Sequence, residues 1–264
     1  MVRAAFALGL VLCLSSLFAQ APPDKQDAAQ SFEVATIKLA ALDQPGRYIT
    51  MQGTNRFVAK FYTLKLMIAA AYNLSPKEIM GGPEWADADH YDILALTPGA
   101  ARPTHDEQMA MLRTLLAARF KLSFHREAKE FSIYRLEVSK TGSKLKQSAA
   151  APGDPAQLIS TVYPQRIHLP ARNATMGDFA SLLQRALLDR PVVDSTDLTG
   201  RYDFDLDWAP DETQFGGEVP VAPQDAQAPP FFTAIKDQLG LELVATRGNV
   251  QALVIDHAET PSAN

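Results

Sequence analysis

The chain repeats one pattern in its two halves, and this repeat limits the folds that it can adopt. A short strand followed by a helix is predicted for residues 55–74 (NRFVAKFYTLKLMIAAAYNL) and again for residues 165–188 (QRIHLPARNATMGDFASLLQRALL), because apolar residues recur at helical spacing in both. Thr63 and Thr175 stand at the same position before the two helices, where a threonine side chain can cap the first turn. Each half is therefore expected to contain the same strand–helix unit.

The repeat continues downstream. The sequence HYDILAL at 90–96 corresponds to RYDFDLDW at 201–208, and within residues 118–138 the stretch 119–138 aligns with residues 238–257 without a gap. In both aligned stretches a helix leads into a strand, a charged turn and a second strand, which predicts one β-hairpin in each half. The two helices are expected at residues 106–119 and 230–239.

This pattern predicts an α+β fold of two similar tandem units, each an antiparallel sheet with packed helices. The first unit is expected at residues 32–146, beginning with the strand FEVATIK (32–38), and the second at residues 159–258. Residues 147–158 are predicted to be a linker, and residues 209–230, which hold five prolines, a loop of the second unit. Chance similarity between the halves is the alternative.

The first residues have the layout of a secretory signal peptide. Arg3 precedes an apolar run at 4–18, and small residues follow at Ala19 and Ala21, so residues 1–21 are predicted to be removed. We expect a periplasmic or extracellular protein with no membrane span after cleavage, since the run is short for a span; a retained anchor is the alternative. The only cysteine lies inside this run, so the mature chain would have no disulfide.

Composition narrows the classes of partner. The 47% hydrophobic content is enough for a packed core, and the formal net charge is −5. A mildly acidic chain without a basic stripe argues against nucleic acid as a partner. No cofactor is predicted.

The stretch YDFDLDW, with its three aspartates, is the part of the sequence that most resembles a catalytic or metal-binding site. Asp203, Asp205 and Asp207 alternate with apolar residues, so in a strand they would share the solvated face. The first half keeps only Asp92 of this series, and a calcium loop would need glycine where Trp208 stands. The favoured interpretation is a solvated strand face. A weak cation site at the three aspartates and a secreted hydrolase that uses them with Asp92 stay open as alternatives.

Other catalytic patterns are missing from the sequence. None of the five histidines has metal-ligand spacing, and no G-x-S-x-G motif occurs. We therefore assign no catalytic and no metal-binding residue.

Four aromatic residues recur around the two YD strands: Trp85, Tyr91, Tyr202 and Trp208. Packing between helix and sheet explains them most simply. The sharper hypothesis is that they bind a ligand in a groove between the halves.

Several segments together carry a family resemblance. FEVATIK, TLKLMIAAAYNL, GGPEWADADHYDI, RPVVDSTDLTGRYDFDLDW and LVIDHAETPSAN follow one another in the order found in the soil-associated secreted proteins of Acidobacteria, which the chain resembles over residues 32–264. That family is defined as a domain of unknown function. The resemblance implies an exported protein and brings no catalytic residue with it.

The sequence thus predicts a non-catalytic binding or interaction module of the cell envelope. Its partner would be an envelope protein of unknown identity or a small ligand. The secreted hydrolase with carboxylates around Asp203 to Asp207 is the alternative.

Overall fold

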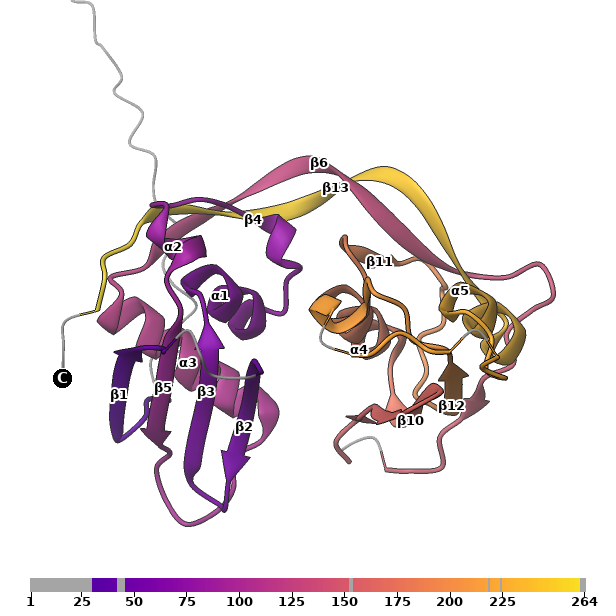
Figure 1. Ribbon diagram of the computed structural model, residues 1–264, viewed down its shortest axis with the longest axis horizontal. Coiled ribbons are helices and arrows are strands. Elements are labelled where there is room, and N and C mark those ends of the chain that lie inside the picture. The colour runs from indigo at the N-terminus through magenta and orange to yellow at the C-terminus, as the bar shows by residue number, and fades with distance from the viewer. Residues whose placement is uncertain (1–29, 42–45, 152–153, 218, 224, 262–264) are drawn as a thin grey trace, which may run out of the picture.

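The structure, a computed structural model, describes residues 30–41, 46–151, 154–217, 219–223 and 225–261. The predicted signal peptide lies outside these residues. The chain forms two helix-covered sheets and a third sheet that arches over both (Figure 1). This arrangement confirms the α+β class. Within the described ranges, no helix has the length and apolar character needed to cross a membrane.

The first sheet is antiparallel and has the strand order β1-β5-β3-β2. Its strands are β1 (Val34–Leu39), β2 (Tyr48–Gln52), β3 (Arg56–Tyr62) and β5 (Tyr91–Leu96). The associated helices are α1 (Leu64–Tyr72), the short η2 (Pro76–Glu78), α2 (Trp85–Ala88) and α3 (His105–Arg119). Apolar side chains of this sheet, of α1 and of α3 form what we call the first core.

The second sheet has the order β7-β12-β10-β8, and β9 also pairs with β10. Its strands are β7 (Lys146–Gln147), β8 (Gln157–Leu158), β9 (Thr161–Tyr163), β10 (Arg166–Ala174) and β12 (Tyr202–Trp208). Its helical segments are α4 (Met176–Leu182), η3 (Leu183–Leu187), η4 (Gln214–Gly217), α5 (Phe231–Ala234) and η5 (Ile235–Leu239). They enclose the second core. The predicted linker 147–158 carries parts of β7 and β8 at its ends, so it is tied into this sheet.

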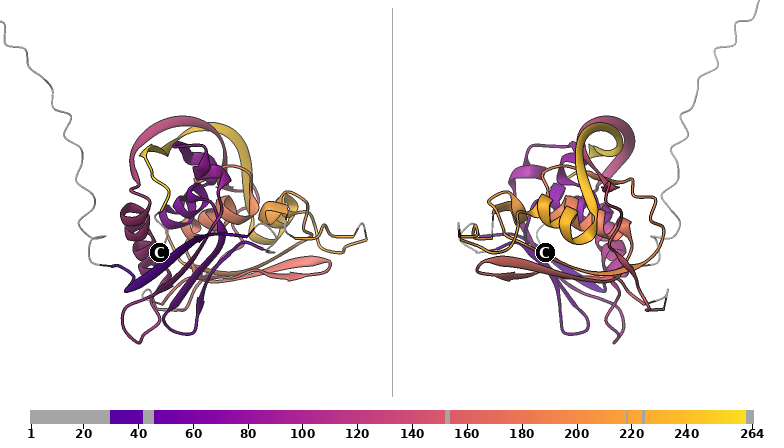
Figure 2. Two further views of the ribbon diagram at one scale, coloured as in Figure 1. Left: turned by 60° about the vertical axis from the view of Figure 1, so that its left-hand side comes forward. Right: turned by 90° about the vertical axis from the view of Figure 1, so that its right-hand side faces the viewer.

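The third sheet is built on two long strands, β6 (Ser123–Val138) and β13 (Leu241–His257), which pair antiparallel along their length and which we call the ribbon. The ribbon arches from one core to the other (Figures 1 and 2). The short strand β4 (Ile79–Gly81) lies parallel to β13 at one end, and β11 (Val192–Asp194) lies parallel to β6 at the other.

The prediction of two separate hairpins was wrong, because the residues of both predicted hairpins form the ribbon. The predicted charged turn HREAKE (125–130) continues as strand inside β6 and pairs with residues of β13. That segment holds no glycine, asparagine or proline, the residues that a tight turn requires. In the second half, Gly248 is also in strand and pairs with Phe131. Each predicted hairpin has opened into one long strand, and the two long strands pair with each other.

Because of this exchange, the two cores do not follow the predicted boundaries 32–146 and 159–258. Leu253 and Ile255, from the C-terminal half of the chain, are buried in the first core. Leu136, from the N-terminal half, is buried in the second core together with Leu241. Each core therefore needs strand residues from both halves.

The helix starts confirm the predicted caps. Thr63 accepts a hydrogen bond from the Leu66 N–H (3.3 Å) at the start of α1. Thr175 accepts one from the Asp178 N–H (3.0 Å) at the start of α4, and Asp178 accepts one from the Thr175 N–H in return. Such side-chain acceptors satisfy amide groups that have no partner within the helix.

The shared ribbon predicts that the two cores unfold together. Leu136→Ala removes a fully buried side chain from the second core and is expected to cost about 2–5 kcal/mol of unfolding free energy. The chain has two tryptophans, Trp85 beside the first core and Trp208 in the second, so single-tryptophan variants report on each core separately. In a Trp208→Phe background, the urea transition seen by Trp85 should shift to lower denaturant when Leu136→Ala is added.

The reciprocal control uses Leu253→Ala in a Trp85→Phe background, where only Trp208 reports. If either tryptophan kept its midpoint while the distant core was damaged, the cores would be independent and the ribbon would not couple them.

Candidate ligand cleft

The aspartates that occur in both halves hold a backbone irregularity in place. Phe61 and Asn173 have positive φ values (58° and 53°) at bulges that precede the caps of α1 and α4 by two residues. Asp92 accepts a hydrogen bond from the Phe61 N–H (3.0 Å), and Asp203 accepts one from the Asn173 N–H (2.8 Å). A non-glycine residue in this conformation is uncommon. The two carboxylates therefore stabilise the point where strand turns into helix.

The remaining two aspartates pair with side chains of the adjacent strand β10. Asp205 accepts two hydrogen bonds from Arg172 (2.9 and 3.1 Å). Asp207 lies 3.2 Å from both His168 Nδ1 and Arg166 Nη1. These are cross-strand pairs on the solvated face of a sheet. In the part of the chain that the structure describes, no group of three or more His, Cys, Asp or Glu side chains is placed to hold a metal.

The geometry does not support the hydrolase alternative, which needs these carboxylates to converge. Asp92 belongs to the first sheet, where its partner is Lys60 at 2.5 Å. The three aspartates of β12 belong to the second sheet, and each has its own partner there.

The four predicted ligand-binding aromatics lie in two separate places. Trp85 and Tyr91 both pack on Phe120 in the first core, with ring centroids 6.3 and 5.3 Å away. Trp208 is fully buried in the second core, which also holds Tyr202. The structure divides these residues between the two cores and does not bring them together in one groove. That they contact a ligand stays a prediction.

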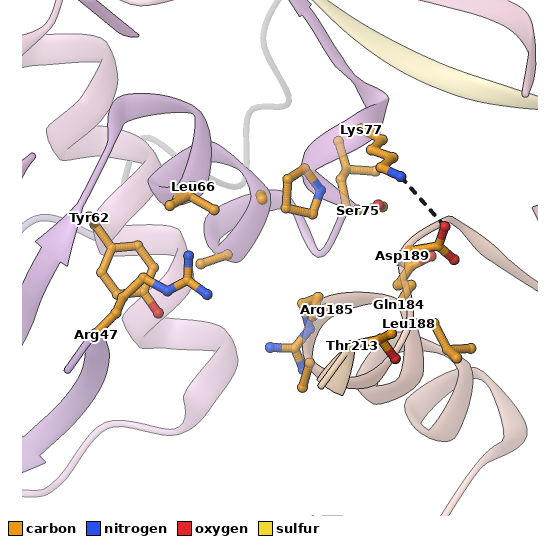
Figure 3. A pocket seen from close by; sticks show the side chains of 15 residues that line it. Arg47, Tyr62, Leu66, Ser75, Lys77, Gln184, Arg185, Leu188, Asp189 and Thr213 are labelled. Atoms are coloured by element: carbon orange, nitrogen blue, oxygen red, sulfur yellow. Dashed lines mark ion pairs between the residues drawn. The ribbon is translucent and has the colours of Figure 1, made fainter. Parts of the chain in front are cut away.

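A cleft of about 290 Å³ opens instead between α1 and η3, where the two halves of the structure face each other (Figure 3). One wall comes from α1 and the strands before it, and the other from η3 and the residues after it. The lining residues include Arg47, Tyr62, Ala69 and Ala70 on the first wall and Arg185 and Leu188 on the second.

The contacts across the mouth of the cleft are polar. Asn73, which ends α1 in a left-handed conformation, donates from Nδ2 to Ser181 Oγ (2.6 Å) and accepts from Gln184 Nε2 at its carbonyl (3.0 Å). Lys77 and Asp189 form a 3.7 Å ion pair beside them. Gln184 also accepts from the Val192 N–H (3.1 Å), which ties the cleft wall to β11 and so to the ribbon.

Two arginines face the cleft from opposite walls. The Arg47 guanidinium lies over the Tyr62 ring, 5.6 Å from its centroid, and Arg185 projects from η3 toward the same space (Figure 3). Arg185 donates a hydrogen bond from Nε to the Ser181 carbonyl (3.2 Å) within its own helix. Among the described residues, neither arginine forms an ion pair with a carboxylate.

Arg185 keeps an exposed surface, although the cleft walls remove part of the water around it. This partial desolvation lowers the pKa of Arg185 from its usual value, while Tyr62 acts in the opposite direction. The pKa of His105, at the start of α3, is lowered by burial and then by the charge of Arg185. Arginine stays protonated in proteins despite such a shift, so the cleft retains its positive charge.

The segment that carries Arg185 is a π-helical turn, Leu183–Leu187. Single π-helical turns are rare and occur frequently at functional sites, although a second one in this chain, η5, does not line the cleft. The sequence does not indicate this site, because neither Arg47 nor Arg185 stands in a motif. The helical periodicity of residues 176–188 gave no sign that the last turn widens.

Comparison with known proteins places the chain in one family. The family model described as "Protein of unknown function (DUF3738)" matches residues 65–258, which is most of the chain. No curated protein and no solved structure matches.

The Asp203 hydrogen bond predicts a specific acid sensitivity. The pKa of Asp203 is lowered below its usual 3.8, first by the hydrogen bond from the Asn173 N–H and then by the Ser148 side chain and the charge of Arg172. A carboxyl whose pKa is lower in the folded state than in the unfolded state stabilises the fold at pH values above 3.8. This contribution is lost as the pH falls toward the pKa of the folded state. Asp203→Asn should therefore be less stable than the wild type at neutral pH, with a difference that shrinks in acid, measured by urea unfolding across that range.

Asp205→Asn is the matched control on the same strand. Its carboxylate pairs with an exposed Arg172 side chain, and exposed ion pairs contribute little. An equal loss of stability in both variants would show that the bulge contact has no special weight.

Proposed function

The chain belongs to the DUF3738 family of proteins of unknown function, and from that premise we propose that it is a binding module whose ligand site is the cleft between α1 and η3. The proposal includes the location that the sequence suggests, the cell envelope or the exterior. Support for that location comes only from the signal-peptide pattern at residues 1–21.

The observation that carries the binding function is the composition of the cleft. Its walls combine apolar side chains, such as Ala70 and Leu188, with two arginines that have no carboxylate partner among the described residues. Ligand sites are typically concave and mostly apolar, with a few polar groups that orient the ligand, and they form preferentially between domains. A volume of about 290 Å³ suits a small molecule or one side of a larger one.

We also propose that the two halves arose from one duplicated unit. Three parallels support this origin: the threonine caps at 63 and 175, the bulges held by Asp92 and Asp203, and the register of the ribbon. In that register, Phe124 pairs with Ile255 at one end, and the corresponding residues Leu243 and Leu136 pair at the other. A ligand site at the junction would then be a product of the duplication, which a single unit lacks.

Filling the cleft tests the binding function. Ala70→Phe places a large side chain in the cleft from a partly exposed position on α1, at the edge of the first core. A thermal-shift screen of small molecules should find compounds that raise the unfolding temperature of the wild type, because a ligand that binds only the folded state stabilises it. The same compounds should have lost most of that effect on Ala70→Phe.

Ala118→Phe is the matched control, since Ala118 is an exposed position of α3 that does not line the cleft. Its response to the compounds should equal that of the wild type. If every stabilising compound acted equally on Ala70→Phe, the cleft would not be the binding site.

A further inference from the structure

We propose that the cleft selects a small organic anion, whose carboxylate or phosphate group is held between Arg47 and Arg185 while its apolar part lies on α1. This inference rests on the proposed binding function and names the ligand class.

The charge distribution favours an anionic ligand. The chain has 30 acidic against 25 basic side chains, so a carboxylate partner is easy to supply. Several other arginines in the described ranges have one, for example Arg172 with Asp205, Arg190 with Asp189 and Arg247 with Glu130. Arg47 and Arg185 pair with none there, although they face the same cleft. Their charge is left for an anion from outside.

The geometry of the cleft also favours an anionic ligand. Arg47 and Arg185 come from opposite walls, and Arg47 lies over the ring of Tyr62 (Figure 3). A guanidinium presents its N–H groups as a planar fork that matches the oxygens of a carboxylate or phosphate. An anion between the walls would take the place of the water that still reaches the exposed Arg185. Lys77 also lines the cleft, but it lies 3.7 Å from Asp189, whose carboxylate it shares with Arg190.

The floor of the cleft favours a ligand with an apolar part. Ala69 and Ala70 line it with small side chains, and Leu66 and Leu74 add apolar surface from the same side. Burial of an apolar group here is favourable at roughly 25 cal/mol per Å² of apolar surface. An inorganic ion would leave this surface in water. The site therefore fits an anion that carries an apolar body.

The test uses three probes with one phenyl group and different heads: phenylacetate, phenyl phosphate and the neutral phenylacetamide. Dissociation constants are measured by calorimetry or NMR titration at fixed ionic strength. The anion of the preferred head group should bind the wild-type chain at least about tenfold more tightly than the amide, since hydrogen bonds to charged groups are roughly twice as strong as neutral ones. Whichever of the two anions binds more tightly identifies the head group.

The variants Arg47→Gln and Arg185→Gln should each weaken the anion by roughly tenfold or more and leave the amide unchanged. Arg185→Lys keeps the charge but loses the fork, and an intermediate loss is expected. Arg56→Gln is the control, because Arg56 is an exposed arginine of β3 that does not line the cleft.

The outcomes separate the two proposals. If no anion binds more tightly than the amide, or if the two arginine variants behave like Arg56→Gln, the inference about the ligand class is overturned. When amide binding is nevertheless blocked by Ala70→Phe, the cleft is still a binding site and only the ligand class is wrong. Anion binding that survives Ala70→Phe unchanged would place the anion elsewhere and overturn both.

Discussion

The pairing of β6 with β13 is the constraint on which the rest of the structure depends. Both cores close on this ribbon, the first on Leu253 and the second on Leu136. Because side chains alternate between the faces of a strand, a slip of one residue would turn the apolar side chains at both ends away from their cores. The register of one pair of strands therefore satisfies two cores at once, and neither core is complete without residues from the other half of the chain.

The cleft follows from how the ribbon joins the cores. Apart from the ribbon, contacts such as Asn73 to Ser181 and Lys77 to Asp189 are polar and lie at the mouth of the cleft. A large apolar interface would have pulled the two walls together and filled the space. Here the ribbon sets the separation of the cores, and small side chains such as Ala70 leave the space between the walls open. Arg47 and Arg185 can then face each other without burying an unpaired charge, because the cleft still admits water and solutes.

Local features could be predicted from the sequence and the pairing of distant segments could not. The caps Thr63 and Thr175 and the alternation along β12 depend on neighbouring residues, and the structure has them as predicted. The same strand residues could form either two hairpins or one ribbon. Only the presence or absence of a turn in the middle of each segment distinguishes these two arrangements. The absence of turn residues from HREAKE was the available signal. The sequence contains no such signal for the cleft, since Arg47 and Arg185 line the same cleft only because of the length and register of the ribbon.

The aspartates of β12 show how a repeated position differs from one that is not repeated. Asp203 has its counterpart in Asp92 because both halves need a carboxylate at the same bulge. Asp205 and Asp207 pair with β10, whereas the first half has Leu94 and Leu96 paired with Val58 and Arg56 of β3. Leu94 is 47% exposed, so the outer face of the first sheet presents apolar surface where the second presents charge. The same bulge therefore has an aspartate in both halves, whereas the outer faces of the two sheets, which lack that backbone constraint, differ in the side chains they present.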